Sequence, residues 1–574
     1  MPLKLVDGRL CGAVHEIAVI GPGIVGMPMA ACMAATGIRW GSDRAARVTV
    51  VQRASASSGW KVDAINRGES VIGGVEPGLD GAVREAVAAG RLRATHRMAD
   101  VAAADLVLVA VQTDRKGLGP DYGPLMEAID ALASALRLRP AGQLPVVVFE
   151  STLAPSSMTT VIRERFERFG LREGQDLLLG NSPNRVMPGR LLERIRESDK
   201  LVAGLHPATP RFLTEIYQQV VTQGRLQPTN SLTAEVVKTL ENAYRDVRIA
   251  FAAEWAAVCE DQDLDFLALR DAVNARLAQT DAASSDPGAV PTGGLLLPML
   301  GVGGHCLPKD GVLLWWRALE AGLDARRSLI LRARGINDGA PGRVIEQIET
   351  RFGSLAGRRI ALLGTAYRFD SEDTRNAPSL SLAAQLRARG AVVRLQDPHV
   401  RPDDPNLLRS GLADCFTRDL DAAVQDAEGL VLCVAHRAYP RAAQPLLTRA
   451  PQARWVFDAA HLWPRAEEAA AGLPVLGIGR GQRGPRPDDV DAVLQSFQVM
   501  AQGVSRELSA VIDHLNAAYA AEAFNRVDLA SVRRLAATCP TGCDLPALDA
   551  TLQAPGPPGE GLALVRTALG LGSV

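Results

Sequence analysis

The stretch His15-Glu16-Ile17-Ala18-Val19-Ile20-Gly21-Pro22-Gly23-Ile24-Val25-Gly26 decides the fold of the first part of the chain. Its first half is mostly apolar and predicts a buried strand, which runs into glycines spaced as GxGxxG and then into a helix of small residues, 27–36. Such glycines permit a tight turn and the close approach of a pyrophosphate, which the helix N-terminus faces. The sequence therefore predicts a dinucleotide-binding turn formed by Gly21, Gly23, Ile24, Val25 and Gly26.

The choice of dinucleotide depends on the end of the next strand, 47–51. An acidic residue that binds the ribose 2′-hydroxyl is expected there, but the chain has Gln52 and Arg53. Arg53 is able to pair with a 2′-phosphate, so NADP is an alternative to NAD. The simpler interpretation is a weaker contact to the ribose of NAD.

Three further strands are expected at 105–110, 144–149 and 176–179, each followed by polar residues. Ligands of open α/β sheets bind beyond the carboxyl ends of parallel strands, so these residues are candidates for a site. The candidates are Thr113, Glu150, Thr152, Asn184 and Arg185. The many turn-forming residues around Asn184 are equally compatible with a plain connection.

One long helix is predicted over 234–259, a stretch that contains no Gly or Pro and is rich in Ala, Val, Leu and Glu. Lys238 and Asn242 are four residues apart and therefore lie on one face of this helix. Charged residues on a helix usually form a solvated face. The apolar neighbours of this pair favour a partly buried position instead.

The loop Gly301-Val302-Gly303-Gly304-His305-Cys306-Leu307-Pro308-Lys309-Asp310 presents one cysteine among glycines. Glycines let a backbone fold tightly and approach a ligand, and a reactive thiol needs the electropositive setting that His305 and Lys309 are able to supply. These features favour Cys306 as a nucleophile. On this stretch alone, an ordinary glycine loop with a bystander cysteine is an equal alternative.

A second α/β pattern follows, with strands expected at 359–364, 392–397, 429–434 and 455–458. It contains no GxGxxG, which indicates a Rossmann-like sheet with a different ligand. Residues 477–487 are rich in Gly, Pro and Arg and are interpreted as a linker. The helical patterns beyond it, at 490–523 and 529–538, carry no evident chemistry and predict packing or subunit contact.

The totals narrow the class of protein. A chain of 574 residues is too long for one core and predicts three or four domains. Lys and Arg number 63 against 64 Asp and Glu, which gives no signal for nucleic acid. Eight cysteines, mostly in apolar runs, indicate buried thiols in a reducing compartment, and the spacing of Cys539 and Cys543 favours no metal. No apolar run reaches the length of a membrane span, so a soluble, cytoplasmic protein is expected.

These elements, in this order, resemble the UDP-glucose/GDP-mannose dehydrogenase family of nucleotide-sugar 6-dehydrogenases over about residues 13–478. The motifs that carry the resemblance are the first glycine turn, Val111-Gln112-Thr113, Glu150-Ser151-Thr152, the Lys238/Asn242 helix, the loop 303–310, Gly364-Thr365-Ala366-Tyr367-Arg368 and Asp373-Thr374-Arg375. Glu150-Ser151-Thr152, Arg185-Val186-Met187-Pro188-Gly189 and His305 are most similar to the enzymes for UDP-N-acetylhexosamines.

The resemblance implies an α/β fold in four parts. These are an NAD(P)-binding Rossmann domain at 1–230, a central helical domain with a long dimerisation helix and the cysteine loop at 231–337, a UDP-sugar-binding Rossmann-like domain at 338–478, and a linker with a helical extension at 479–574. It also implies a homodimer. NAD is expected to be preferred over NADP because the family uses it.

The resemblance further implies a reaction, in which a sugar C6 alcohol is oxidised twice through an adduct of Cys306 and then released by water as a uronic acid. Lys238 and Asn242 would stabilise oxyanions, and Asp310 would assist the thiol or the water. Thr113 and Thr152 would lie near the nicotinamide and Arg375 close to the cofactor. The substrate would be bound by Asn184, Arg185, Lys238, Asn242, Gly303 and Arg368.

Three positions depart from the family pattern. Asn184 stands where the family has a glutamate that serves as general base for hydrolysis, and an amide cannot take a proton from water in that role. Glu150 or Asp310 would have to substitute. Arg368 replaces a lysine, and Asp458-Ala459-Ala460-His461 lacks an arginine expected to bind the diphosphate.

Two other functions stay open at this point. One is an oxidoreductase of the same fold that acts on an unusual nucleotide or sugar-like substrate and stops before hydrolysis. The other is a non-catalytic nucleotide-sugar-binding or assembly subunit that uses the C-terminal extension for interaction. The joint presence of Lys238, Asn242, Cys306 and Asp310 argues against the second, because a binding subunit has no need of the thiol.

Overall fold

The computed structural model describes residues 4–6, 9–56, 58–139, 144–278, 291, 293–520, 522–539 and 543–548. Its contacts divide the chain into two compact units, which are described one at a time. The first comprises Met1–Glu241, Val312–Leu323 and Leu508–Cys543, and the second comprises Asn242–Gly311, Asp324–Glu507 and Asp544–Val574. The boundaries of the four domains expected from the sequence stay predictions.

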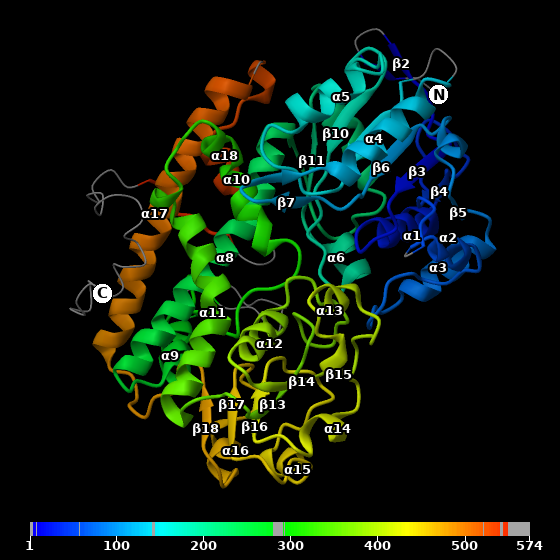
Figure 1. Ribbon diagram of the computed structural model, residues 1–574. Helices are drawn as coiled ribbons and strands as arrows, with labels where there is room; N and C mark the ends of the chain where they lie inside the picture. Colours follow the sequence, from blue (N-terminus) through cyan, green and yellow to red (C-terminus); the bar gives the residue numbers. More distant parts are fainter. Residues whose placement is uncertain are drawn as a thin grey trace. The chain divides into compact units, whose positions relative to one another are not determined.

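Among the described residues, an eight-stranded sheet forms the centre of the first unit (Figure 1). Its strands lie in the order β12-β11-β10-β9-β6-β3-β4-β5; β10 and β11 are antiparallel and the other pairs are parallel. The bounds are β3 (Glu16–Ile20), β4 (Arg47–Val51), β5 (Leu92–Thr95), β6 (Leu106–Val109), β9 (Val146–Phe149), β10 (Leu178–Asn181), β11 (Lys200–Gly204) and β12 (Leu226–Asn230). The order reverses between β3 and β6, where such sheets bind dinucleotides.

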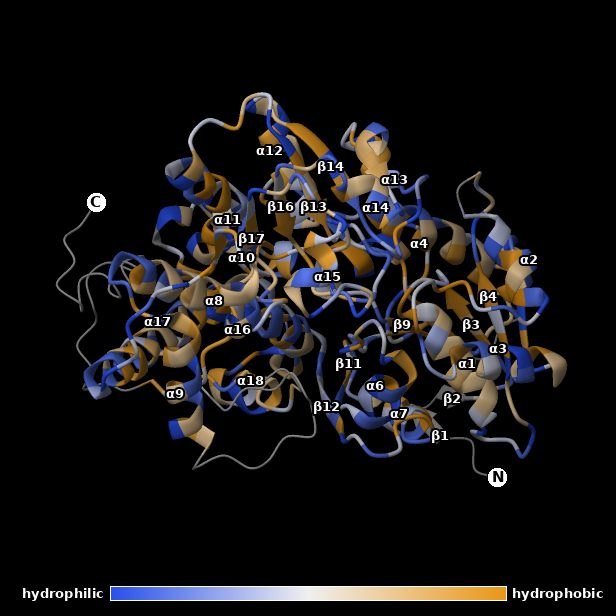
Figure 2. Cartoon of the chain, turned by 90° about the horizontal axis from the view of Figure 1, so that it is seen from below, coloured by the Kyte–Doolittle hydropathy of each residue, from blue (hydrophilic) through white to orange (hydrophobic). Residues whose placement is uncertain are grey.

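This sheet is buried on both faces because alternate residues of its strands point in opposite directions. On β3, Ile17 and Val19 pack into one core and Ala18 and Ile20 into the other. The first core contains the small residues of the helix α1 (Gly26–Thr36), and the second contains the apolar face of the helix α4 (Gly123–Leu136). Figure 2 shows the strands in hydrophobic colours and the helices with both colours. The predicted strand-turn-helix at the N-terminus is confirmed.

The remaining elements of the first unit are mostly helices and short hairpins. They are α1 (Gly26–Thr36), α2 (Trp60–Asn66), α3 (Leu79–Ala88), α4 (Gly123–Leu136), α5 (Arg163–Glu167), α6 (Leu191–Glu197), α7 (Ala208–Tyr217) and α18 (Leu529–Ala536), the short turns η1 (Met98–Val101), η2 (Met158–Ile162) and η5 (Ala523–Asn525), and the pairs β1 (Lys4–Val6) with β2 (Arg9–Cys11) and β7 (Asp114–Lys116) with β8 (Gly119–Asp121).

The second unit contains a six-stranded parallel sheet, again counted among the described residues (Figure 1). Its order is β15-β14-β13-β16-β17-β18, which repeats the crossover pattern of the first sheet. The bounds are β13 (Arg359–Leu363), β14 (Val392–Gln396), β15 (Phe416–Thr417), β16 (Gly429–Leu432), β17 (Trp455–Asp458) and β18 (Val475–Gly477). The predicted second Rossmann-like sheet is confirmed.

Helices complete the second unit, and three long helices contribute residues to both units. The first group is α9 (Phe266–Ala278), α11 (Leu329–Phe352), α12 (Pro378–Ala388), α13 (Pro405–Arg409), α14 (Leu420–Val424), α15 (Ala443–Leu447) and α16 (Arg465–Ala470), with the turns η3 (Ala325–Arg327) and η4 (Ala413–Cys415). The long helices are α8 (Ser231–Asp261), α10 (Leu307–Glu320) and α17 (Pro487–Tyr519). α8 confirms the single long helix predicted over 234–259.

The segment interpreted as a linker, 477–487, is held against the end of α8. The backbone N–H of Gly479 donates to Glu260 at 2.6 Å, and the N–H of Arg483 donates to the carbonyl of Asp263 at 2.7 Å. The composition of this segment predicts a linker, and these two hydrogen bonds anchor it. Within the part of the chain that the structure describes, no helix is long and apolar enough to cross a membrane.

Candidate functional site

The glycine turn after β3 contains two glycines that the fold requires and one that faces open space. A Cβ on Gly26 would lie 2.1 Å from the carbonyl oxygen of Gly21, and a Cβ on Gly21, at φ +92°, would lie 2.8 Å from the carbonyl oxygen of Ala110. Around Gly23 a Cβ would meet nothing within 4 Å, so the turn stays open on that side. Two glycines are thus required by the fold, while Gly23, Ile24 and Val25 lie directly before α1, and their predicted contact with a dinucleotide phosphate stays a prediction.

The end of β4 carries hydrogen-bonding groups in place of a carboxylate. The Gln52 side-chain amide donates to the Ser58 hydroxyl at 2.9 Å. Arg53 is exposed and forms an ion pair with Glu127 at 2.8 Å. An exposed pair of this kind contributes little stability, so the guanidinium of Arg53 is readily redirected to another anion.

The loops after β6 and β9 are joined by direct contact. The Thr113 hydroxyl donates to the carbonyl of Thr152 at 2.7 Å, and Thr113 is buried. Ser151 donates to the carbonyl of Val111 at 2.5 Å. Thr113 and Thr152, both predicted near the nicotinamide, therefore lie together at the carboxyl edge of the first sheet.

Glu150 is buried at this edge and receives three donors. The Lys200 ammonium lies 2.9 Å from its Oε2, the Asn184 amide donates to the same oxygen, and the Tyr217 hydroxyl donates to Oε1. Lys200 also donates to the carbonyl of Ser182 at 2.9 Å, and burial lowers its pKa below the ordinary value. Glu150 and Asn184, predicted as separate site residues, are thus parts of one buried network in which the carboxylate is engaged.

Arg185, the neighbour of Asn184, is held by protein groups on several sides. Its guanidinium pairs with Glu241 of α8 and donates to the carbonyl of Asp199 at 2.9 Å. It also donates to the hydroxyl of Thr538 at 2.9 Å and to the carbonyl of Leu535 at 3.2 Å, which belong to the C-terminal extension. The predicted role of Arg185 toward substrate stays a prediction, and its observed contacts link α8 to α18.

In the second unit, the cysteine loop packs on residues 367–378. A Cβ on Gly303 would lie 2.6 Å from Cβ of Tyr367, and one on Gly304, at φ +82°, would lie 3.0 Å from the Tyr367 ring. The Asn376 amide donates to the carbonyl of Gly304 at 2.9 Å. Glycine is required at both positions because Tyr367 occupies the space that a side chain would need.

Cys306 ends this loop and is exposed, whereas the other cysteines that the structure describes are buried. Its carbonyl accepts the N–H groups of Lys309 and Asp310 at 3.1 and 3.0 Å, so it stands immediately before the first turn of α10. The positive end of a helix dipole favours an anion at that point. The Tyr367 ring packs against the same loop at Gly304, and burial raises the pKa of Tyr367 to about 12.

Asp310 is buried, and its two carboxylate oxygens contact Asn242 and Lys309. Its Oδ2 accepts from the Asn242 amide at 2.5 Å, and its Oδ1 lies 2.6 Å from the ammonium of Lys309, which is also buried. The structure therefore brings Asn242 and Asp310 together. Lys238, one turn before Asn242 on α8, is buried at 8% exposure.

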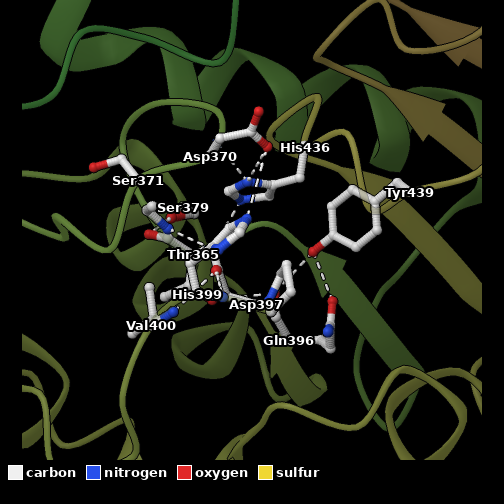
Figure 3. A network of polar contacts seen from close by, with 12 residues as sticks. Thr365, Asp370, Ser371, Ser379, Gln396, Asp397, His399, Val400, His436 and Tyr439 are labelled. Carbon is white, nitrogen blue, oxygen red and sulfur yellow. Dashed lines mark hydrogen bonds and ion pairs between the residues drawn. The ribbon is translucent and has the colours of Figure 1, made fainter. Parts of the chain in front are cut away.

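Asp397 organises the carboxyl edge of the second sheet (Figure 3). Its Oδ2 accepts the N–H groups of Thr365 and Ala366, at 2.8 and 2.9 Å, and lies 3.0 Å from Nε2 of His436. Burial opposes ionisation, but the hydrogen bond from His436 holds the pKa of Asp397 below its ordinary value. One carboxylate thus fixes the loops that follow β13, β14 and β16.

Asp370, His399 and His436 meet the spacing of a metal site, the one such group among the described residues, with ligand atoms within 4.8 Å of one another. Both ring nitrogens of His436 are committed, however, since Nδ1 accepts the N–H of Asp370 at 2.9 Å and Nε2 is bonded to Asp397 (Figure 3). These bonds fix the tautomer with the proton on Nε2. The group is therefore a polar network that positions the Asp370 loop.

The positions that depart from the family pattern at 458–461 form a buried corner. Asp458 accepts the N–H groups of Ala460, Leu462 and Trp463, and the guanidinium of Arg480 lies 3.8 Å from it. Nε2 of His461, at φ +48°, bonds the carbonyl of Pro298 at 2.8 Å. Burial and the charge of Arg480 lower the pKa of His461 to about 4.

The other predicted positions of this unit, Arg368 and Arg375, lie on the loop after β13. Arg375 donates to both oxygens of Asp373, at 2.9 and 3.1 Å from its Nε, and its own carbonyl accepts the N–H of Gly304. The Arg368 guanidinium lies over the Phe369 ring at 5.1 Å. Their roles toward ligands stay predictions.

Several residues of these networks were not predicted from the sequence. They are Lys200, Tyr217, Asp397 and His436. Asp397 and His436 follow β14 and β16, so the rule on strand ends that selected Thr113 and Glu150 would also have found them. Lys200 and Tyr217 carry no local signal, because their partner Glu150 lies far away in the sequence.

The chain matches three models of one family in consecutive stretches. The NAD binding domain of the UDP-glucose/GDP-mannose dehydrogenase family matches residues 15–221, the central domain 232–339 and the UDP binding domain 361–465. The helices α17 and α18 lie beyond these matches.

Relatives match most of the chain. A UDP-N-acetyl-D-mannosamine dehydrogenase of Pyrococcus horikoshii is 30% identical over 471 residues, which are 81% of this chain and 99% of the relative. An NDP-N-acetyl-D-galactosaminuronic acid dehydrogenase of Ralstonia nicotianae is 30% identical over 79% of this chain and 98% of its own length. The solved structure of an NDP-N-acetyl-D-galactosaminuronic acid dehydrogenase from Methanosarcina mazei is 31% identical, with a TM-score of 0.66, and the match covers 82% of this chain and 96% of that one. The chain therefore belongs to the UDP-glucose/GDP-mannose dehydrogenase family and is an NAD-dependent oxidoreductase.

Proposed function

We propose that the chain is a nucleotide-sugar 6-dehydrogenase that oxidises the C6 alcohol of a UDP-hexose or UDP-N-acetylhexosamine to the uronate. The names of the relatives, which refer to N-acetylated hexosamine derivatives, support a UDP-N-acetylhexosamine within that class. The observation that carries the proposal is the exposed Cys306 at the start of α10, with Asn242 and Asp310 joined nearby in the same unit.

The first half of the reaction converts the alcohol to an aldehyde. NAD, when bound, supplies the hydride acceptor, and the C6 hydroxyl loses its proton as the C–H bond breaks. Lys238 and Asn242 donate hydrogen bonds to the C6 oxygen, where negative charge develops. Donors that are held in place before the reaction, as Asn242 is by Asp310, cost no reorganisation at that moment.

The second half runs through Cys306. The thiolate adds to the aldehyde carbon, forming a C–S bond and an oxyanion that Lys238 and Asn242 stabilise. A second NAD, when bound, would accept the remaining C6 hydride to leave a thioester, and water then adds to the thioester carbon, breaking the C–S bond so that the carboxylate leaves and the thiol of Cys306 is restored. Cys306 stands directly before the first turn of α10, and the positive end of a helix dipole is a favourable place for an anion.

A second candidate function is oxidation that stops before hydrolysis. It is favoured by Asn184, whose amide donates to Glu150 and has no carboxylate of its own to activate water. The carboxylates of Glu150 and Asp310 are both engaged by Lys and Asn side chains. Under this alternative the sugar leaves as the aldehyde or stays bound to Cys306. Homodimer formation and cytoplasmic location remain predictions.

A substrate panel tests the proposal. The purified protein is incubated with NAD and one of several UDP-hexoses, UDP-N-acetylhexosamines or GDP-mannose, and reduced cofactor is followed by absorbance. We expect turnover with at least one UDP-sugar and much slower turnover with GDP-mannose. Binding of UDP-sugars without any reduced cofactor would instead support a non-catalytic binding subunit.

A further inference from the structure

The C-terminal extension adds a long amphipathic helix to which the proposed reaction assigns no part. On α17, Val493, Met500 and Val504 are buried to 1% exposure or less, while Asp491 and Gln498 are exposed. A helix with one apolar stripe covers an apolar surface elsewhere. The contacts of the stripe identify that surface.

The surface is the second part of α8. The Phe497 ring meets Phe251 edge-to-face at a centroid distance of 5.7 Å, and the guanidinium of Arg248 lies 5.9 Å from the same ring. The Trp255 indole N–H donates to the hydroxyl of Ser496 at 3.2 Å. Phe251 and Trp255 are each 1% exposed. α17 therefore buries the flank of α8 formed by Arg248, Phe251 and Trp255.

A buried polar contact fixes α17 in this place. Glu507 is 8% exposed, and it accepts the N–H of Leu329 at 2.9 Å and the hydroxyl of Ser328. These groups form the N-terminus of α11, where a carboxylate is favoured by the helix dipole and by otherwise unpaired N–H groups. Such a bond is costly to break, because it would leave buried donors without acceptors.

The predicted linker, residues 477–487, leads into α17 and is bonded to the C-terminal end of α8. Besides the bonds of Gly479 and Arg483, the N–H of Asp265 donates to the carbonyl of Arg483 at 2.8 Å. Arg276 of α9 then pairs with Asp491 in the first turns of α17 at 2.5 Å. The chain is thus bonded to its own α8 and α9 up to the point where α17 begins to pack.

We propose that α17 closes the Arg248, Phe251 and Trp255 flank of α8 within its own chain, so that this flank is not an interface for a second copy. Along α8, every residue from Ser231 to Glu260 is buried or partly buried. A homodimer built on α8, the helix to which the resemblance assigns it, then has to use residues of α8 outside this flank.

The aromatic surface that α17 covers is large enough to affect self-association of the chain. Two aromatic side chains bury roughly 300–500 Å² together, which is the size of patch that drives association when it is exposed. A chain without α17 in place would therefore present a strong self-association site. Cover in the same chain removes that site at any protein concentration.

A crosslink across an exposed contact tests the proposal on the full chain. Arg276 and Asp491 face each other on α9 and α17 and are both more than half exposed, so the double variant Arg276→Cys/Asp491→Cys is suited to a short bismaleimide. The exposed Cys306 is changed to Ser in every sample to remove its thiol. The two single-cysteine variants are controls, and multi-angle light scattering gives the mass before and after crosslinking.

We expect a crosslink within one chain, seen as a shifted band near 61.0 kDa on denaturing gels, and an unchanged mass in solution. Adding Phe497→Asp should lower the crosslinking yield severalfold, and the matched change Gln498→Asp on the exposed side should not. A covalent two-chain product that needs both cysteines would overturn the proposal, because α17 would then pack on another copy. A fall in mass when α17 is locked to its own chain would also overturn it.

Discussion

Cys306 is the residue on which the proposed chemistry depends. It combines an exposed thiol, a loop that only glycine can form against Tyr367, and the positive end of α10. A buried cysteine such as Cys415 has none of these features, and burial raises the pKa of its thiol. The two thiols therefore make a matched pair for substitution.

Cys306→Ser should lower the turnover of the UDP-sugar by roughly 10³-fold or more, because a hydroxyl near neutral pH does not add to the aldehyde as a thiolate does. Cys415→Ser should keep most of the activity. Initial rates of NAD reduction measure both, and substrate binding by calorimetry shows whether the fold of the site is kept. Full activity of Cys306→Ser would rule out the thioester route.

Gln52 and Arg53 decide how the cofactor ribose is recognised. Gln52→Asp restores an acceptor for the 2′-hydroxyl and repels a 2′-phosphate, so the preference for NAD over NADP should rise about tenfold or more, in line with a hydrogen bond to a charged group. The ratio of kcat/KM for the two cofactors measures it. We expect the unchanged protein to prefer NAD already. A large preference for NADP that Arg53→Ala removes would contradict this expectation.

His461 makes stability depend on pH. Its folded pKa of about 4 lies below the unfolded value of 6.5, so its contribution is complete above pH 6.5 and is lost as the pH falls toward 4. At about 1.4 kcal/mol per pKa unit, the loss is at most about 3.5 kcal/mol. In His461→Asn, which tolerates the positive φ, this loss should disappear. Urea unfolding at pH 7 and pH 5 measures it, and an equal loss in both proteins would contradict the assignment.

At the scale of elements, sequence patterns predicted those helices, strands and turns whose residues are neighbours along the chain. The strand β3, the glycine turn and the helix α1 follow one another directly, and α8 carries its pattern over many turns, so both were predicted correctly. Partners from distant parts of the chain were not. Glu150 is bonded to Lys200 and Tyr217, and Glu507 caps a helix that begins at Leu329, because the fold brings them together.

Two glycines of the turn after β3 are expected to serve different purposes: Gly26 is required by the fold, and Gly23 by the cofactor. Gly26→Ala places a Cβ 2.1 Å from a backbone oxygen and should destabilise the protein by about 2–4 kcal/mol. Gly23→Ala meets no atom within 4 Å, so stability should change by less than about 1 kcal/mol while the Kd for NAD rises. Thermal unfolding and NAD titration measure the two effects. Equal destabilisation by both changes would contradict this division.

At the scale of the whole molecule, three matched family domains are followed by helices that the family models do not include. The resemblance predicted the α/β fold with its two Rossmann-like sheets, but it contained no information on α17. The apolar stripe of α17 predicts an amphipathic helix and does not show which surface that helix packs on. The anchoring of the predicted linker was also not predicted, because its acceptors, Glu260 at the end of α8 and Asp263 just beyond it, lie far away in the sequence. The residues of the proposed reaction thus lie in the matched family domains, while the helix that covers the flank of α8 lies beyond them.

Asn184 leaves one question that concerns the complete reaction, namely whether the sugar reaches the acid. The most direct test counts the reduced NAD formed per molecule of UDP-sugar consumed, with the sugar product identified by mass spectrometry. The proposed function predicts two reduced cofactors and a uronate. One reduced cofactor with an aldehyde product, or a single turnover that leaves the sugar on Cys306, would contradict it.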